Sequence, residues 1–220
     1  MIALYAEIQE DKHELLLRNN LKLFSKEHQE RLLRYRRWQD LQLSLLGKLL
    51  IKEGMKSISE TTDFKKLRFT KYKKPYFENT PVQFNISHAG QLAIAIIAAN
   101  YETDIGIDIE KIHPVCVQDF VPQMTTYEQE VVLNAVDKQN AFFNYWTQKE
   151  AVIKAHGKGL AIPLTSFEVK NNKAHIDDLT FFLTKMEVKD GYVCHCATQE
   201  KINREQFILK EININRFTTT

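Results

Sequence analysis

The spacing of hydrophobic residues changes along the chain between helical and strand periods, which predicts a mixed fold. Apolar residues recur every three or four positions in four segments, which predicts helices over residues 11–24, 26–53, 126–137 and 140–156. Gly54 and Gly157 follow two of these segments and are typical of helix ends.

Short apolar runs predict the strands. Residues 84–89 and 92–99, separated by Gly90 and Gln91, are typical of a buried hairpin. The basic stretch 62–82, interrupted by prolines, predicts a loop with room for one short strand. The remaining strands are expected over 2–8, 105–109, 166–169, 179–188, 192–198 and 206–214. This pattern alone indicates an α+β fold of one or two lobes.

Composition narrows the class of protein. The 220 residues are 44% hydrophobic and 26% charged, with a formal net charge of +2, which is ordinary for a soluble globular chain. The near-neutral charge argues against nucleic acid as a partner. No apolar run approaches the roughly 20 residues of a membrane helix, and the first residues lack a signal-peptide pattern. We therefore expect a cytoplasmic protein that binds no membrane.

Two clusters of residues leave alternatives open. Basic residues gather at 31–37 and 65–74, either as solvated faces or as a pocket for a polyanionic ligand. Cys194 and Cys196 flank His195, as metal ligands could. Their alternating pattern favours buried strand cysteines instead.

The strand predicted at 105–109 carries carboxylates on one face. Alternation places its three isoleucines toward the core and Asp104, Asp108 and Glu110 on the other face, where Gly106 would leave space for a ligand to approach the backbone. Neighbouring carboxylates repel one another unless a cation lies between them, and Mg²⁺ suits such oxygen ligands. The alternative is an edge strand with a solvated acidic face.

Two further segments carry polar side chains of interest. Glu150 and Lys154 share one helical stripe with Trp146, either as a simple ion pair or as a carboxylate and an ammonium presented to a substrate. Ser87 and His88 lie at the end of a strand. Adjacent strand residues point to opposite faces, so these two do not form a hydrolase pair.

Taken together, these segments resemble a known family. The order Phe84-Asn-x-Ser-His88, Ile105-Gly-Ile-Asp-x-Glu110 and Trp146-x-x-Lys-Glu-Ala-x-x-Lys-x-x-Gly-x-Gly-Leu160 is similar to the pattern of the 4′-phosphopantetheinyl transferase superfamily, in its two-lobed, surfactin-synthetase-activating type. The looser similarity runs over about 20–200 and includes Tyr72-Lys-Lys-Pro75.

The resemblance implies an enzyme that moves 4′-phosphopantetheine from coenzyme A to a serine of an apo acyl or peptidyl carrier protein, with release of 3′,5′-ADP. It implies Mg²⁺, with Mn²⁺ as the alternative, held by Asp108, Glu110 and Glu150. Lys154 would contact the phosphates, and Glu150 would accept the serine proton, with Glu128 as second candidate. The other coenzyme A contacts would be Arg31, Lys74, Ser87 and His88, with Trp146 and Leu160 in supporting packing.

The chain departs from the family at its basic residues. Arg31 matches a position that often contacts the 3′-phosphate of coenzyme A, but His28 and Leu43 replace other basic residues. We expect Arg34, Arg36 or Arg37 to substitute.

The resemblance also implies a pseudo-dimer of two similar α+β lobes, 1–102 and 103–220, with the active site in the cleft between them. Chains of this length are expected to be monomers. The rival functions are an Mg²⁺-dependent coenzyme A pyrophosphohydrolase and a non-catalytic protein that binds coenzyme A or a carrier.

Overall fold

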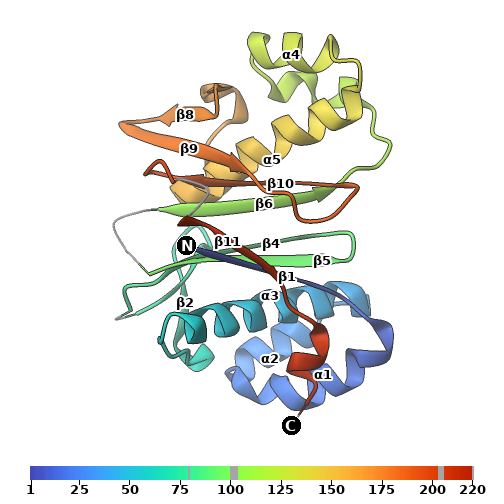
Figure 1. Cartoon of the computed structure of the whole chain (residues 1–220), viewed down its shortest axis with the longest axis vertical. Coiled ribbons are helices and arrows are strands. Elements are labelled where there is room, and N and C mark those ends of the chain that lie inside the picture. Colours follow the sequence, from blue (N-terminus) through green and yellow to red (C-terminus); the bar gives the residue numbers. More distant parts are fainter. Residues whose placement is uncertain (79, 100–103, 203–205, 220) are drawn as a thin grey trace.

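The computed structural model describes residues 1–78, 80–99, 104–202 and 206–219. Two β-sheets lie face to face at the centre of the molecule, and each is covered on its outer side by helices (Figure 1). Apolar side chains fill the space between the sheets, among them Ile94 and Ile96 from one sheet and Ile107 from the other. Cys194 and Cys196 are buried in the same core, as the alternating pattern predicted.

The N-terminal lobe contains the sheet of order β11-β1-β5-β4. Helices α1, α2 and α3 lie below this sheet in Figure 1. A separate two-stranded hairpin, β2-β3, occupies part of the predicted loop 62–82. The bounds are β1 Ile2–Glu7, α1 His13–Asn20, α2 Lys26–Leu33, α3 Trp38–Ser57, β2 Leu67–Phe69, β3 Pro75–Phe77, β4 Gln83–Ala89 and β5 Leu92–Ala98, with 3-10 helices at Glu10–Lys12, Leu21–Leu23 and Phe64–Lys66.

The C-terminal lobe contains the sheet of order β6-β10-β9-β8-β7, with α5 packed on its outer face and α4 beyond it. The bounds are β6 Ile105–Lys111, α4 Thr126–Leu133, α5 Lys138–His156, β7 Val169–Lys170, β8 Lys173–Ile176, β9 Leu179–Lys185 and β10 Tyr192–Thr198, with 3-10 helices at Val117–Gln123, Gly159–Ala161 and Leu164–Ser166.

The two lobes repeat the same arrangement. In each, the first strand pairs antiparallel with the last strand of a hairpin, giving the orders β1-β5-β4 and β6-β10-β9. In each, a short helix precedes a long one, and a hydroxyl group caps the short helix: Ser25 on α2 and Thr125 on α4. The predicted α+β fold of two similar lobes is therefore confirmed.

The boundary predicted at 102/103 falls within 100–103, outside the described residues. One segment crosses between the lobes: β11, Ile208–Glu211, runs parallel to β1 and completes the N-terminal sheet. A final 3-10 helix, Ile214–Phe217, packs its apolar residues into the N-terminal core. Of the strand predicted over 206–214, only the central part, Ile208–Glu211, forms a strand.

Several helix and strand predictions had wrong bounds, and α3 continues past Gly54, the predicted helix end, to Ser57. The helix expected over 26–53 is interrupted at 34–37, where arginines with like charge would face one another at helical spacing. The helix expected over 11–24 is reduced to α1 between two 3-10 turns. In the region predicted as a strand over 166–169, the chain first forms a 3-10 helix and then pairs only from Val169.

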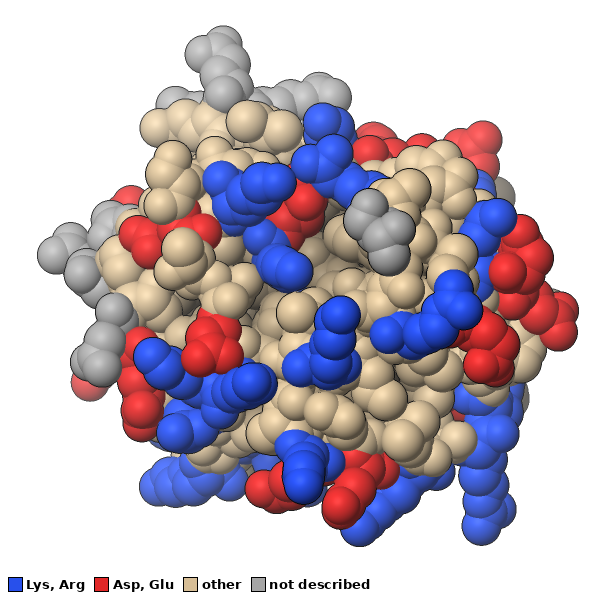
Figure 2. Space-filling view, turned by 90° about the horizontal axis from the view of Figure 1, so that it is seen from below, with Lys and Arg blue, Asp and Glu red and all other residues tan. Residues whose placement is uncertain are grey.

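The helical face of the N-terminal lobe carries many lysine and arginine side chains, with acidic side chains among them (Figure 2). Because both signs are interspersed, this face does not present a uniformly basic surface, in agreement with the near-neutral net charge. Among the residues that the structure describes, no helix is long and apolar enough to cross a membrane.

Candidate functional site

The candidate site lies where the two sheets meet. β4 and β6 are terminal strands of their sheets, and the Asn85 side chain joins them by accepting a hydrogen bond from the Ile107 N–H at 3.0 Å. Two residues further along β4, the Ser87 hydroxyl donates to Asp108 Oδ1 at 2.8 Å. Because strand residues alternate, one face of β4 therefore connects the N-terminal lobe to the carboxylate strand.

Lys154 adds the third side chain to this junction. From α5, its Nζ donates to Asp108 Oδ1 at 2.6 Å and to Ser87 Oγ at 2.9 Å. Its ion-pair partner is thus Asp108 on another element, and not Glu150 one turn away on the same helix. The structure therefore brings the three sequence motifs together in one network of Ser87, Asp108 and Lys154.

Gly106 has a different role from the one predicted. A Cβ atom at this position would lie 2.2 Å from the Ala151 carbonyl oxygen and 2.3 Å from the Ala155 nitrogen. The space beside Gly106 is therefore filled by the backbone of α5, and the prediction that a ligand approaches there was wrong. The glycine allows α5 to lie close to β6, which brings Lys154 within reach of Asp108.

The carboxylates of the site repel one another in an environment poor in water. Burial, and next the charge of Asp108, raise the pKa of Glu110 to about 7, against a smaller lowering effect of Lys154. Burial raises the pKa of Glu150, where Asp108 adds to the effect and Lys154 opposes it. Asp108 itself is 3% exposed, so the predicted solvated acidic face is not what the structure shows.

The oxygen atoms of these carboxylates are the ligands that a hard divalent cation prefers. Within the described ranges, no three His, Cys, Asp or Glu side chains are arranged as a finished metal site. However, Asp108 Oδ2 is buried and has no hydrogen-bond partner among the described residues. An oxygen without a partner beside two other carboxyl groups fits a hard divalent cation such as Mg²⁺. The cation would bind that oxygen and reduce the repulsion among the carboxylates.

Of the other predicted contacts, Lys74 and His88 also lie near this junction. Lys74 Nζ donates to the Ala155 carbonyl at 2.8 Å and pairs with Asp104 at 3.2 Å, so it stabilises the C-terminal end of α5. The pKa of His88 is lowered by partial desolvation of its imidazole ring and then by the charges of Lys154 and Lys48.

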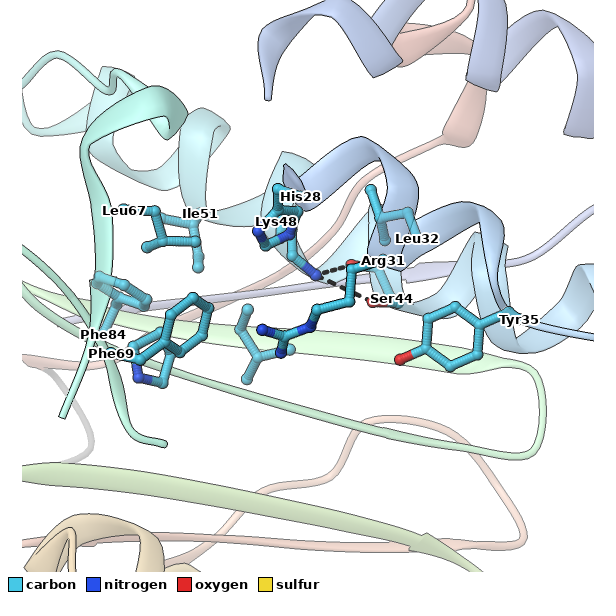
Figure 3. A pocket seen from close by; sticks show the side chains of 12 residues that line it. His28, Arg31, Leu32, Tyr35, Ser44, Lys48, Ile51, Leu67, Phe69 and Phe84 are labelled. Carbon is cyan, nitrogen blue, oxygen red and sulfur yellow. Dashed lines mark hydrogen bonds between the residues drawn. The ribbon is translucent and has the colours of Figure 1, made fainter. Parts of the chain in front are cut away.

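A cavity of about 100 Å³ lies between α2, α3 and the β2-β3 hairpin (Figure 3). Arg31 lines it, whereas Arg34, Arg36 and Arg37 do not. Leu43 is buried in the hydrophobic core of the lobe. The second cation of the cavity is Lys48, which the sequence motifs did not indicate. The only signal for Lys48 was a lysine within an otherwise apolar stretch of a helix, and such lysines are common on surfaces.

Glu128 is built into the structure of the C-terminal lobe. Its carboxylate accepts the Thr125 N–H in a capping box and pairs at 2.6 Å with Lys149, whose side chain is fully buried. Both oxygens of Glu128 are thus engaged in contacts that stabilise the lobe. Trp146 packs against Phe120 and Phe142, as expected. The side chain of Leu160 lies outside the described residues.

Comparison with known proteins gives the family. Residues 104–197 match the model described as "4'-phosphopantetheinyl transferase superfamily", and residues 11–102 match that described as "4'-phosphopantetheinyl transferase, N-terminal". The chain is 32% identical over 190 residues to the 4'-phosphopantetheinyl transferase gsp of Aneurinibacillus migulanus, covering 79% of this chain and 76% of that protein. It is 33% identical over 156 residues to the transferase Sfp of Bacillus subtilis (strain 168), covering 68% and 67%.

The chain therefore belongs to the 4′-phosphopantetheinyl transferase superfamily, enzymes that act on coenzyme A and carrier proteins. Among solved structures, the holo-[acyl-carrier-protein] synthase of Thermotoga maritima is similar over 45% of this chain and 64% of that chain, with 22% identity. The TM-score of 0.37 is too low for that likeness to support an argument.

Proposed function

We propose that this chain transfers 4′-phosphopantetheine from coenzyme A to the serine hydroxyl of an apo carrier protein, at the junction formed by Ser87, Asp108 and Lys154. The observation that supports this site most directly is the buried contact of Asp108 with Lys154 and Ser87, which joins both lobes. The carrier serine would attack the phosphorus on the pantetheine side of the pyrophosphate, and 3′,5′-ADP would leave.

Such a phosphoryl transfer depends on positioning and on neutralising charge. Asp108, Glu110 and Glu150 are the residues that would hold Mg²⁺ or Mn²⁺, and the bound metal supplies charge neutralisation at the pyrophosphate. Among the described residues, the only other hydrogen bond of Lys154 Nζ is to the Ser87 hydroxyl, so the ammonium can move from Asp108 to a phosphate oxygen. It would then stabilise the charge on the leaving side.

Glu150 is the proposed acceptor of the serine proton. Burial raises its pKa, which makes its carboxylate a stronger base near neutral pH than an exposed glutamate. Ser87, His88, Lys74 and Arg31 are the proposed contacts to coenzyme A. The proposed partner is an acidic carrier of fatty-acid, polyketide or nonribosomal-peptide assembly. This chain is proposed to act as a monomer in the cytoplasm.

The test is intact-mass spectrometry of an apo acyl or peptidyl carrier after incubation with this protein, coenzyme A and Mg²⁺, with EDTA as the control. A gain of one phosphopantetheine group that EDTA prevents is the expected result. Consumption of coenzyme A with no change in any of several carriers would point to the pyrophosphohydrolase. Binding of coenzyme A without consumption would leave a non-catalytic binding protein.

A further inference from the structure

A side chain of the N-terminal lobe supports the edge of β6. β4 and β6 are the terminal strands of their sheets and lie side by side where the lobes meet (Figure 1). β6 pairs with β10 along one edge, and on the other edge the Ile107 N–H donates to Asn85 Oδ1 at 3.0 Å. Asn85 and Ile107 are both buried, so without Asn85 this N–H would be left unpaired away from water. Asn85 therefore takes the place of a neighbouring strand.

This link lies one residue before the central carboxylate of the site. Asp108 follows Ile107, and Ser87 lies two residues after Asn85 on the same face of β4. The two hydrogen bonds, from Ile107 to Asn85 and from Ser87 to Asp108, therefore join the same pair of strands. Without the first, β6 is free to shift relative to β4, and the 2.8 Å contact between Ser87 Oγ and Asp108 Oδ1 is lost.

The two oxygens of Asp108 have different surroundings. Oδ1 accepts from the Ser87 hydroxyl and, at 2.6 Å, from the Lys154 ammonium. Oδ2 is buried and has no hydrogen-bond partner in the described part of the chain. The contacts to Oδ1 thus fix the rotation of the carboxyl group and leave Oδ2 for a cation. When Lys154 moves to a phosphate, Ser87 is the donor to Oδ1 that remains among the residues described.

We propose that Asn85 is a positioning residue for the metal: it holds β6 on β4, so that Ser87 orients Asp108 with Oδ2 presented to Mg²⁺ or Mn²⁺. This inference rests on the proposed function, in which Asp108 is a metal ligand. Asn85 acts through Ile107 and Ser87 and does not itself contact the reacting groups. The N-terminal lobe supplies none of the three proposed metal ligands, yet through Asn85 it determines how tightly the metal binds.

The test measures binding of Mn²⁺ to the full-length protein by electron paramagnetic resonance. Coenzyme A is present at saturation, no carrier is added, and coenzyme A alone is the blank. The variants are Asn85→Ala, Ser87→Ala and the two combined. Gln42→Ala is the matched control, because Gln42 is also a buried amide of the N-terminal lobe, and it bonds the Gln9 backbone at 2.7 and 3.0 Å instead of β4 or β6. Thermal melts compare the stability of all variants.

Asn85→Ala and Ser87→Ala are each expected to weaken Mn²⁺ binding by about tenfold or more, the usual effect of losing a group that orients a metal ligand. Because Asn85 acts through Ser87, the double variant should lose no more than the larger of the two single losses. Ser87→Thr keeps the hydroxyl and should restore the affinity. Gln42→Ala should lower the melting temperature and leave Mn²⁺ binding unchanged.

Unchanged Mn²⁺ affinity in Asn85→Ala, an equal loss in Gln42→Ala, or additive losses in the double variant would each overturn the inference. A wild-type protein that binds no Mn²⁺ beyond the blank would do the same. Asn85→Ser is used if Asn85→Ala does not fold, since its shorter side chain also loses the direct bond to Ile107. A protein whose Mn²⁺ binding depends on Asn85 in this way but that modifies no carrier would overturn the proposed transfer and leave the role of Asn85 standing.

Discussion

At the scale of single residues, Glu150 and Glu128 offer two carboxylates with different surroundings. Glu128 is 4% exposed, with both oxygens bonded, whereas no hydrogen bond to the Glu150 carboxylate is found among the described residues. Glu150→Gln should lower kcat by about a hundredfold or more, the size of effect seen when one key polar group of an active site is removed. The melting temperature should stay within a few degrees of that of the wild type.

Glu128→Gln should behave in the opposite way. It leaves the buried Lys149 ammonium with backbone carbonyls but without its anionic partner, so the free energy of unfolding should fall by about 3–5 kcal/mol. Transfer at low temperature, where the protein is still folded, should stay within a few-fold of wild type. Thermal melts and mass-spectrometric rates on both variants check this. A large loss of rate in folded Glu128→Gln would return Glu128 to consideration as the base.

His195 predicts a pH dependence of stability. Its Nδ1 lies 2.7 Å from Thr147 Oγ1, which donates to the Phe143 carbonyl, so Nδ1 carries the proton and Nε2 faces Gln148. Burial, with a smaller effect of Lys185, lowers the pKa of His195 from 6.5 to about 3. Between these values the unfolded chain binds more protons, so stability falls as the pH is lowered.

The His195 contribution should amount to at most roughly 4 kcal/mol on going from pH 7 to pH 3.5. His195→Asn can still donate to Thr147 and cannot be protonated, so it should flatten this part of the decline. His175→Asn, at an exposed histidine, is the control and should leave the slope unchanged. Urea unfolding at a series of pH values measures the difference, and identical slopes in all three proteins would contradict the assignment.

At the scale of elements, the contact between β6 and α5 determines how the site is assembled. Gly106→Ala would place a methyl group within 2.3 Å of two backbone atoms of α5, which cannot rotate away. We expect a loss of about 3 kcal/mol or more in stability, with a lower kcat because Lys154 moves away from Asp108.

Gly54→Ala is the matched control for this contact. Its Cβ would meet mainly the end of the Ile97 side chain, which can change rotamer, and alanine also favours a helix. Its stability should therefore change much less. Chemical unfolding and transfer rates compare the two variants, and a harmless Gly106→Ala would show that the close approach of α5 is not required.

The sequence predicted most elements and the motifs that meet at the junction. Strand alternation correctly placed Ile107 and Ile109 in the core and Asp108 on the opposite face. It could not show that this face is covered by a helix, because periodicity does not say what packs on a strand. For the same reason Gly106 was assigned to a ligand. Lys48 was missed because the cavity that it lines with Arg31 is formed by two separate helices.

At the scale of the whole molecule, the C-terminal segment closes the chain onto its beginning. β11 pairs in register with β1 from Ile2 to Tyr5, and Asn19 and Asn20 donate to the carbonyls of Thr218 and Phe217. The N-terminal sheet and its helical core therefore depend on residues about 200 positions away. Local sequence patterns could not predict this, because the pairing is a long-range contact whose partner strand is only four residues long.

Phe217 tests whether this closure stabilises the N-terminal lobe. Its side chain is 9% exposed and belongs to the same core as Leu49 and Ile214. Phe217→Ala should lower the free energy of unfolding by about 3–5 kcal/mol, the usual cost of removing a buried aromatic ring. Ile208→Ala is the control, because Ile208 lies on β11 but is 57% exposed, and it should cost less than about 1 kcal/mol.

Hydrogen exchange locates the effect: protection should fall in β1 and α3 more than in α5. Equal stability of the two variants would mean that the C-terminal segment packs on the lobe without stabilising it. The pairing with β5 alone would then stabilise β1.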